Sequence, residues 1–209
     1  MSDSVTGLMR RGRTFYEGAT PPTDANVGQS LKLEGYQKTF NDTDPSVTAG
    51  PKQNRSNRKV ECMLVRNVSG ITLAAKRTVT WAAGYRGRRV DGYGTLGTQE
   101  IAGVVDDLIG SAGVADNDLF WLVRKGPCLC RTDVAALVSF LEGEVLVGLT
   151  AVTSQSMTAG RVSALVAGTT NVTYMVSSSL NRIGRAISAK TTANTNSDVL
   201  VDLEILSVA

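Results

Sequence analysis

The residues with the clearest potential for chemistry are Cys128 and Cys130, in the segment WLVRKGPCLCRTD (121–133), which also carries three basic residues. Two thiols near arginine and lysine could form a reactive site, because a nearby positive charge lowers the pKa of a thiol. They could also form half of a zinc site, which takes its remaining ligands from elsewhere in the chain. The chain supplies one further cysteine, Cys62, and no histidine.

The spacing of the pair favours packing over chemistry. On a strand, positions i and i+2 point to the same face and lie about 7 Å apart, whereas a disulfide requires Cα atoms near about 5.5 Å. Without histidine the chain lacks the usual general base for a thiol nucleophile. We therefore predict that the cysteines pack as small apolar residues, and that the protein is not an enzyme and has no catalytic residues, metal site or cofactor. A thiol enzyme is the alternative.

Other chemical patterns in the sequence are weaker. GYGTLG (92–97) has the lettering of a dinucleotide-binding loop, but that pattern carries meaning only between a strand and a helix of a βαβ unit. The carboxylate pairs Asp106-Asp107 and Glu142 with Glu144 lie beside residues typical of turns. General acid–base catalysis needs carboxylates that converge in a pocket, so we interpret both pairs as solvated charge and expect no small-molecule substrate.

Composition sets the broad class of protein. The chain has 209 residues and a net charge of +3. Residues 1–90 carry 15 basic and 7 acidic residues, whereas residues 91–209 carry 7 basic and 12 acidic residues. The two parts are therefore expected to face different surroundings. No signal-like or membrane-spanning apolar stretch is evident, so we expect a soluble protein made in a reducing compartment, with no membrane partner.

Residues 1–58 differ in character from the rest of the chain. They contain four of the five prolines, many turn-forming residues and only isolated apolar residues. Such a segment cannot bury enough apolar surface to offset an ordering cost of about 1–2 kcal/mol per residue. We predict a long extended N-terminal arm over residues 1–58, either partly disordered or ordered on a partner.

From residue 59 the sequence alternates between short apolar segments and turns. VECMLVRN (60–67) places Val60, Cys62 and Leu64 on one face, and LFWLVRK (119–125) begins as a strand covered on both faces. Gly126-Pro127 is expected to interrupt that strand. Further strands are expected over 69–81, 100–107, 144–152, 157–168, 171–178, 181–190 and 198–207.

One short helix is predicted over VAALVSFLE (134–142), with Asp133 as its N-cap and Gly143 just beyond its C-terminus. Short strands at this spacing are typical of an all-β barrel or sandwich. The fold class we predict is therefore mainly β: a small barrel- or sandwich-like domain over residues 59–209 with one short helix, preceded by the arm.

Basic residues cluster in the first half, around Arg10, Lys52 to Lys59 and Arg86 to Arg89. They could neutralise phosphates of nucleic acid, with residues 52–90 as the binding region. They could instead dock on an acidic protein surface. Aromatic residues make up 5% of the chain, which is few for a single-strand stacking platform, so nucleic acid is the less favoured partner.

Three short motifs resemble segments of the small capsid decoration, or cement, proteins of tailed bacteriophages. They are Ala102-Gly103-Val104-Val105, followed by an apolar strand that ends at Lys125-Gly126, and later Ile183-Gly184-Arg185-Ala186-Ile187 before a polar loop and a terminal strand. The resemblance covers roughly residues 60–209. The long N-terminal region is a departure from the shorter members of that family.

The resemblance implies a structural virion protein that sits on the capsid exterior, cements adjacent major capsid protein subunits against DNA pressure, and forms a homotrimer. It would be made in the bacterial host cytoplasm. Another head or tail structural component of a phage is a further alternative. Candidate capsid contacts are the basic and aromatic residues of the arm and its junction with the domain: Arg10, Arg11, Arg13, Phe15, Tyr16, Tyr36, Phe40, Arg55, Arg58 and Lys59.

Overall fold

The computed structural model describes residues 11–12, 14–15, 34–47, 51, 53–93, 100–132, 140–148, 160–164, 181–190 and 197–205. These residues form eleven strands and no helix. The strands are β1 (Thr14–Phe15), β2 (Gln37–Thr43), β3 (Asn54–Asn67), β4 (Thr78–Thr80), β5 (Arg89–Val90), β6 (Ile101–Val105), β7 (Leu119–Arg131), β8 (Val145–Gly148), β9 (Val162–Ala164), β10 (Arg182–Ala186) and β11 (Asp198–Glu204).

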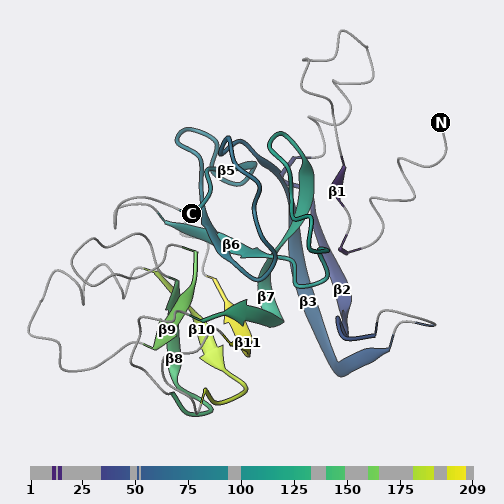
Figure 1. Ribbon diagram of the computed structural model, residues 1–209, viewed down its shortest axis with the longest axis vertical. Helices are drawn as coiled ribbons and strands as arrows, with labels where there is room; N and C mark the ends of the chain where they lie inside the picture. Colours follow the sequence, from purple (N-terminus) through teal and green to yellow (C-terminus); the bar gives the residue numbers. More distant parts are fainter. Residues whose placement is uncertain are drawn as a thin grey trace, which may run out of the picture.

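All eleven strands belong to one sheet organised around β7. The main path runs β2-β3-β7-β11-β10-β8-β9, and all pairs along it are antiparallel. The first half of β7 is flanked by β3 on one side and by β1 and β6 on the other, and its second half pairs with β11. In Figure 1, β7 lies between the long β2–β3 hairpin and the group formed by β8 to β11. The predicted mainly β fold is confirmed.

Strand β7 passes through Gly126-Pro127 where the sequence predicts an interruption. Gly126 has φ of 91°, and a Cβ atom there would lie 2.2 Å from the Lys59 carbonyl oxygen. Only glycine fits so close to a neighbouring backbone. Arg124 is the extra residue of a bulge against β3, since Glu61 pairs with Lys125 and Cys62 with Val123. The bulge and the glycine bend the strand without ending it.

Separate apolar clusters cover the two faces of β3 and β7. Cys62, Leu64 and Trp121 belong to the larger cluster, together with the buried faces of β8 to β11. Val65, next to Leu64, and Phe120, next to Trp121, belong to the smaller cluster, which also includes residues of β4 and β6. Successive strand residues point to opposite faces, so burial of both sets confirms the prediction that LFWLV is covered on both sides.

The short helix is not confirmed. Residues 133–139 lie outside the described part of the chain, and Phe140 forms an antiparallel bridge with Lys190. The expected strand over 69–81 is also shorter, with β4 limited to residues 78–80 and Leu73 in an isolated bridge. Lys76, at φ of 67°, breaks the extended backbone between them. No helix of the described residues is long and apolar enough to cross a membrane.

The long N-terminal arm is not confirmed either, because the predicted boundary at residue 58 falls inside β3. Strand β2 pairs with β3 from Gln37 opposite Met63 to Thr43 opposite Asn54. Residues 37–43 and 54–58 therefore belong to the sheet. The sequence does not predict β2, because its inward positions lack an apolar pattern. Two of these three positions, Lys38, Phe40 and Asp42, are charged.

Candidate partner-binding surface

The ten residues predicted as partner contacts fall into three groups. Arg10, Arg13 and Tyr16 lie outside the described residues, and Phe15 is described only as a backbone partner of Leu119 in β1. Arg11 and Arg55 take part in a buried ion cluster. The remaining four, on or next to β2 and β3, are Tyr36, Phe40, Arg58 and Lys59.

Arg11 points into the protein and is not available to a partner. Its guanidinium group lies 2.8 Å from Asp106 and 2.7 Å from Asp107, and its side chain is 2% exposed. The backbone N–H of Gly12 also donates to Asp106. Burial alone would lower the pKa of Arg11, but the two carboxylates outweigh burial and raise it. The predicted role of Arg11 as a surface contact is therefore wrong.

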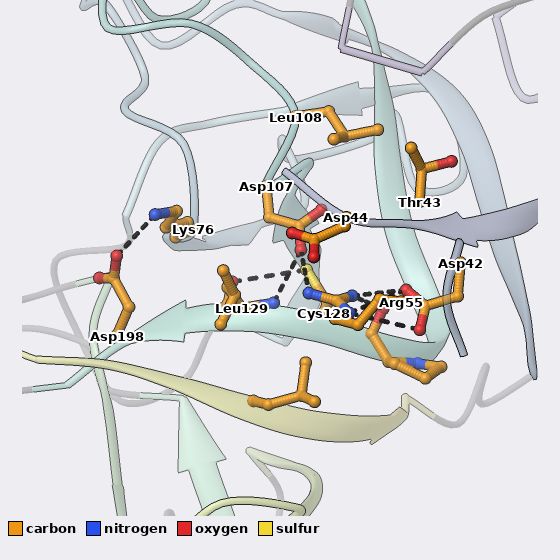
Figure 2. A network of polar contacts seen from close by, with 12 residues as sticks. Asp42, Thr43, Asp44, Arg55, Lys76, Asp107, Leu108, Cys128, Leu129 and Asp198 are labelled. Atoms are coloured by element: carbon orange, nitrogen blue, oxygen red, sulfur yellow. Dashed lines mark hydrogen bonds and ion pairs between the residues drawn. The ribbon is translucent and has the colours of Figure 1, made fainter. Parts of the chain in front are cut away.

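Arg55 extends the same cluster from β3. Its guanidinium group contacts Asp42 at 2.6 Å and Asp107 at 3.1 Å, and it donates to the Pro127 carbonyl oxygen. Figure 2 shows Arg55 between the two carboxylates, with the Leu129 N–H donating to Asp107 from β7. We call Arg11, Asp42, Arg55, Asp106 and Asp107 the buried ion cluster. It ties residues 11–12, the β2–β3 hairpin, the segment after β6 and the second half of β7 together.

The carboxyl group of Asp107 has a raised pKa. A carboxyl group of this kind is a candidate catalytic acid. Burial raises its pKa most, and the neighbouring Asp106 raises it further. Its oxygens are nevertheless occupied by Arg11, Arg55 and the Leu129 N–H. Neither groove described below is lined by Asp106 or Asp107. This arrangement serves to join segments.

All three cysteines lie in the larger apolar cluster, unpaired and buried. Burial raises the pKa of the Cys62 and Cys128 thiols well above the ordinary value, which keeps both protonated at neutral pH. A protonated thiol is a poor nucleophile and a poor metal ligand. No group of three or more metal-ligating side chains occurs among the described residues. This is the environment expected for cysteines that pack as apolar side chains.

The aromatic residues of the β2 region lie against Trp121 of β7. The Phe40 and Trp121 rings meet edge-on with centroids 5.0 Å apart, and the Tyr36 ring lies 6.2 Å from Trp121. Phe40 is partly buried against the core and anchors β2. Tyr36 is 55% exposed, so of this pair it is the residue that a partner can contact.

Two adjoining grooves of about 430 Å³ each are lined by residues of β3 and of neighbouring strands. They share Glu61, Lys125 and Glu204, and they extend over β2, β3, β7, β11 and the Arg185 side of β10. We call the two together the basic groove, because six basic residues line it against three acidic ones. The basic residues are Lys38, Arg58, Lys59, Arg124, Lys125 and Arg185, and the acidic residues are Glu61, Asp202 and Glu204.

Exposed interactions hold the charges of the groove in place. Arg58 contacts Asp202 at 2.6 Å with both side chains exposed, and Lys125 lies 3.5 Å from Glu61. Lys59 donates to the Asn41 side chain. Exposed pairs of this kind stabilise a fold by only about 0–1 kcal/mol. These cations can therefore exchange their present partners for carboxylates of a binding partner at little cost in stability.

Sequence reasoning found Arg58 and Lys59 but missed Lys125, Arg185 and Glu204 of the same groove. These residues are far apart in sequence and come together because β7 bends at Gly126 and pairs with β11. The available signal was their outward position on alternating strands, which indicates exposure but not proximity.

Comparisons with known proteins do not assign the chain to a family. No family model matches it, and no curated protein matches it.

Proposed function

We propose that this protein is a capsid decoration protein, which binds the outer surface of a bacteriophage shell and cements adjacent major capsid protein subunits. The observation that carries the proposal is the basic groove: an exposed surface on a sheet, with twice as many basic as acidic side chains. Charge complementarity to an acidic protein exterior would steer association and fix the orientation of docking. The sheet is a rigid support, so little conformational freedom is lost on binding.

The resemblance in sequence is the second support for the proposal, and two of its motifs lie on either side of β11 in the sheet. Gly126 of the Lys125-Gly126 motif and Gly184 of the β10 motif pair with the same residue, Leu203, from opposite sides. A Cβ atom at Gly184 would lie 2.0 Å from the Asp202 carbonyl oxygen. The motifs thus have a physical reason to be glycine-containing in a domain with this strand order. The homotrimeric state that the resemblance implies forms part of the proposal.

Binding of nucleic acid through residues 52–90 is the second candidate, and the ion pairs of this region weigh against it. Arg55 is in the buried ion cluster, and Arg66 and Arg89 both contact Glu34. Affinity for nucleic acid depends on cations that neutralise phosphates, and these three arginines are held by buried carboxylates.

The proposal is tested by co-sedimentation of the purified protein with empty shells of the major capsid protein encoded by the same genome. We expect saturable binding, and weaker binding when Arg58 and Arg185 are both changed to Gln. Arg131→Gln is the matched control, because Arg131 also pairs with an aspartate of β11, at 3.0 Å, but does not line the groove. Absence of binding to shells, together with salt-sensitive binding to DNA, would favour the nucleic-acid alternative.

A further inference from the structure

A second exposed surface lies at the turn of residues 82–89, which leads into β5. We call it the Tyr85 turn. Tyr85 in this turn is 48% exposed. Arg86 and Arg88 beside it are exposed as well. Tyrosine and arginine are among the residue types most enriched at energetically dominant positions of protein interfaces.

The turn is held in shape by its own backbone. The Tyr85 N–H donates to the Ala82 carbonyl oxygen, and the Tyr85 carbonyl oxygen accepts from both Arg88 and Arg89. Gly84 and Gly87 have φ of 76° and 80°, a conformation that glycine adopts without strain. A surface with a fixed backbone loses little conformational entropy when a partner binds.

Side-chain contacts also fix the position of the Tyr85 ring. The guanidinium group of Arg89 stacks over the Tyr85 ring at 4.4 Å from its centroid. Arg89 and Arg66 both contact Glu34, whose side chain is 2% exposed. The Tyr85 ring is therefore supported on one face by an arginine that is itself fixed to a buried carboxylate, and exposed elsewhere.

The charge at the tip distinguishes between classes of partner. Arg86 is paired with Glu100 at 2.6 Å and Arg89 with Glu34 at 3.1 Å. Arg88 has no side-chain hydrogen bond or ion pair to any residue in the described ranges. One uncompensated cation beside a fixed aromatic ring suits a carboxylate on a protein surface. A nucleic-acid backbone site requires several uncompensated cations.

We propose that the Tyr85 turn is a docking tip for an acidic protein surface, with Tyr85 as the aromatic contact and Arg88 as the partner of a carboxylate. No residue of 82–89 lines the basic groove, so the tip is a second contact surface of the protein. A second contact made once the groove is bound would gain from high effective concentration. The identity of the partner as a capsid subunit rests on the proposed function.

The test compares wild type with Tyr85→Ala and Arg88→Gln in co-sedimentation with the same capsid shells. We expect each variant to bind at least about tenfold more weakly, and Tyr85→Phe, which keeps the ring, to bind nearly as wild type. Circular dichroism should show unchanged folding, because the changes are at exposed positions of a turn. Binding of both variants at wild-type strength would overturn the docking tip and leave the proposed function standing.

If wild type does not bind shells, the proposed function fails and the tip is tested separately. The probe is then a poly-L-glutamate chain of about 20 residues, followed by amide NMR of the full-length protein. Shifts at residues 85–88 that persist in the Arg58→Gln/Arg185→Gln variant and disappear in Arg88→Gln would support the tip. No shifts there, or tighter binding of an oligothymidylate of the same length at the same residues, would refute it.

Discussion

The guanidinium group of Arg11 donates two hydrogen bonds to the carboxylate of Asp106, although the two residues are 95 positions apart in the chain. Both side chains are buried. This contact and the pairing of β1 with β7 make residues 11–12 and 14–15 part of the folded structure. These residues of the predicted arm therefore pack on the sheet.

Replacing Arg11 by Ala should strongly destabilise the protein. The change leaves Asp106 and part of Asp107 without their buried partner, and breaking a buried ion pair in this way costs about 3–5 kcal/mol. Urea denaturation measures the difference in the free energy of unfolding. Arg58→Ala is the control, because its exposed pair with Asp202 should contribute about 1 kcal/mol or less. Equal effects of the two changes would contradict a buried role for Arg11.

Removal of residues 1–58 should prevent folding. The deletion eliminates β2, the first five residues of β3 and two arginines of the buried ion cluster. We expect the remaining chain to give a non-cooperative thermal transition and rapid amide exchange. Removal of residues 1–10 alone keeps Arg11 and β1 and is the control. A shortened chain of residues 59–209 with a cooperative transition would restore the two-part description of the sequence.

Gly126→Ala should destabilise the protein far more than Gly143→Ala. Both glycines have positive φ, 91° and 86°, so both substitutions place alanine in a left-handed conformation that costs about 1–2 kcal/mol. Only at Gly126 would the added Cβ also collide with a carbonyl oxygen, that of Lys59. The comparison therefore isolates the close approach at the bend of β7. Similar thermal midpoints for the two variants would show that the bend is not tightly packed.

Asp198 should make the stability depend on pH. Burial alone would raise its pKa, but hydrogen bonds and charges from Lys76 and Arg131 outweigh burial and lower the pKa below 3.8. A lowered pKa means that the folded state favours the ionised form, so the stabilisation is present above about pH 3.8 and is lost as the pH falls through the folded-state value.

Unfolding free energies of wild type and Asp198→Asn, measured from pH 7 to pH 2, test this expectation. The variant should be less stable at pH 7, and the difference should shrink as the pH falls below about 4. Asp202→Asn is a suitable comparison, since Asp202 is a similarly placed aspartate of β11 with a single arginine partner. A difference that grows toward low pH would contradict the lowered pKa of Asp198.

Local patterns in the sequence account for much of the fold. The apolar pattern correctly places a strand at β11 within the expected range 198–207, and the doubly apolar start of β7 predicts its burial on both faces. These signals work because they depend only on neighbours along one strand. The burial of the cysteines follows from the same reasoning.

The sequence was less informative where distant segments determine the outcome. Gly126-Pro127 looks like the end of a strand, but the close approach of Lys59 and the pairing with β11 carry β7 through it. Arg11 and Arg55 look like surface charges until Asp42, Asp106 and Asp107 are seen around them. Tertiary contacts override local preference at such positions, and a single sequence does not show which charges meet.

The central claim, that this protein docks on the outside of a phage shell through the basic groove, is tested most directly by electron cryo-microscopy of shells incubated with the purified protein. We predict added density on the outer surface, with β3 and β11 facing the shell and Arg58 and Arg185 near acidic residues of the major capsid protein. Shells that remain undecorated at saturating protein concentration, or density in which the groove faces solvent, would contradict the claim.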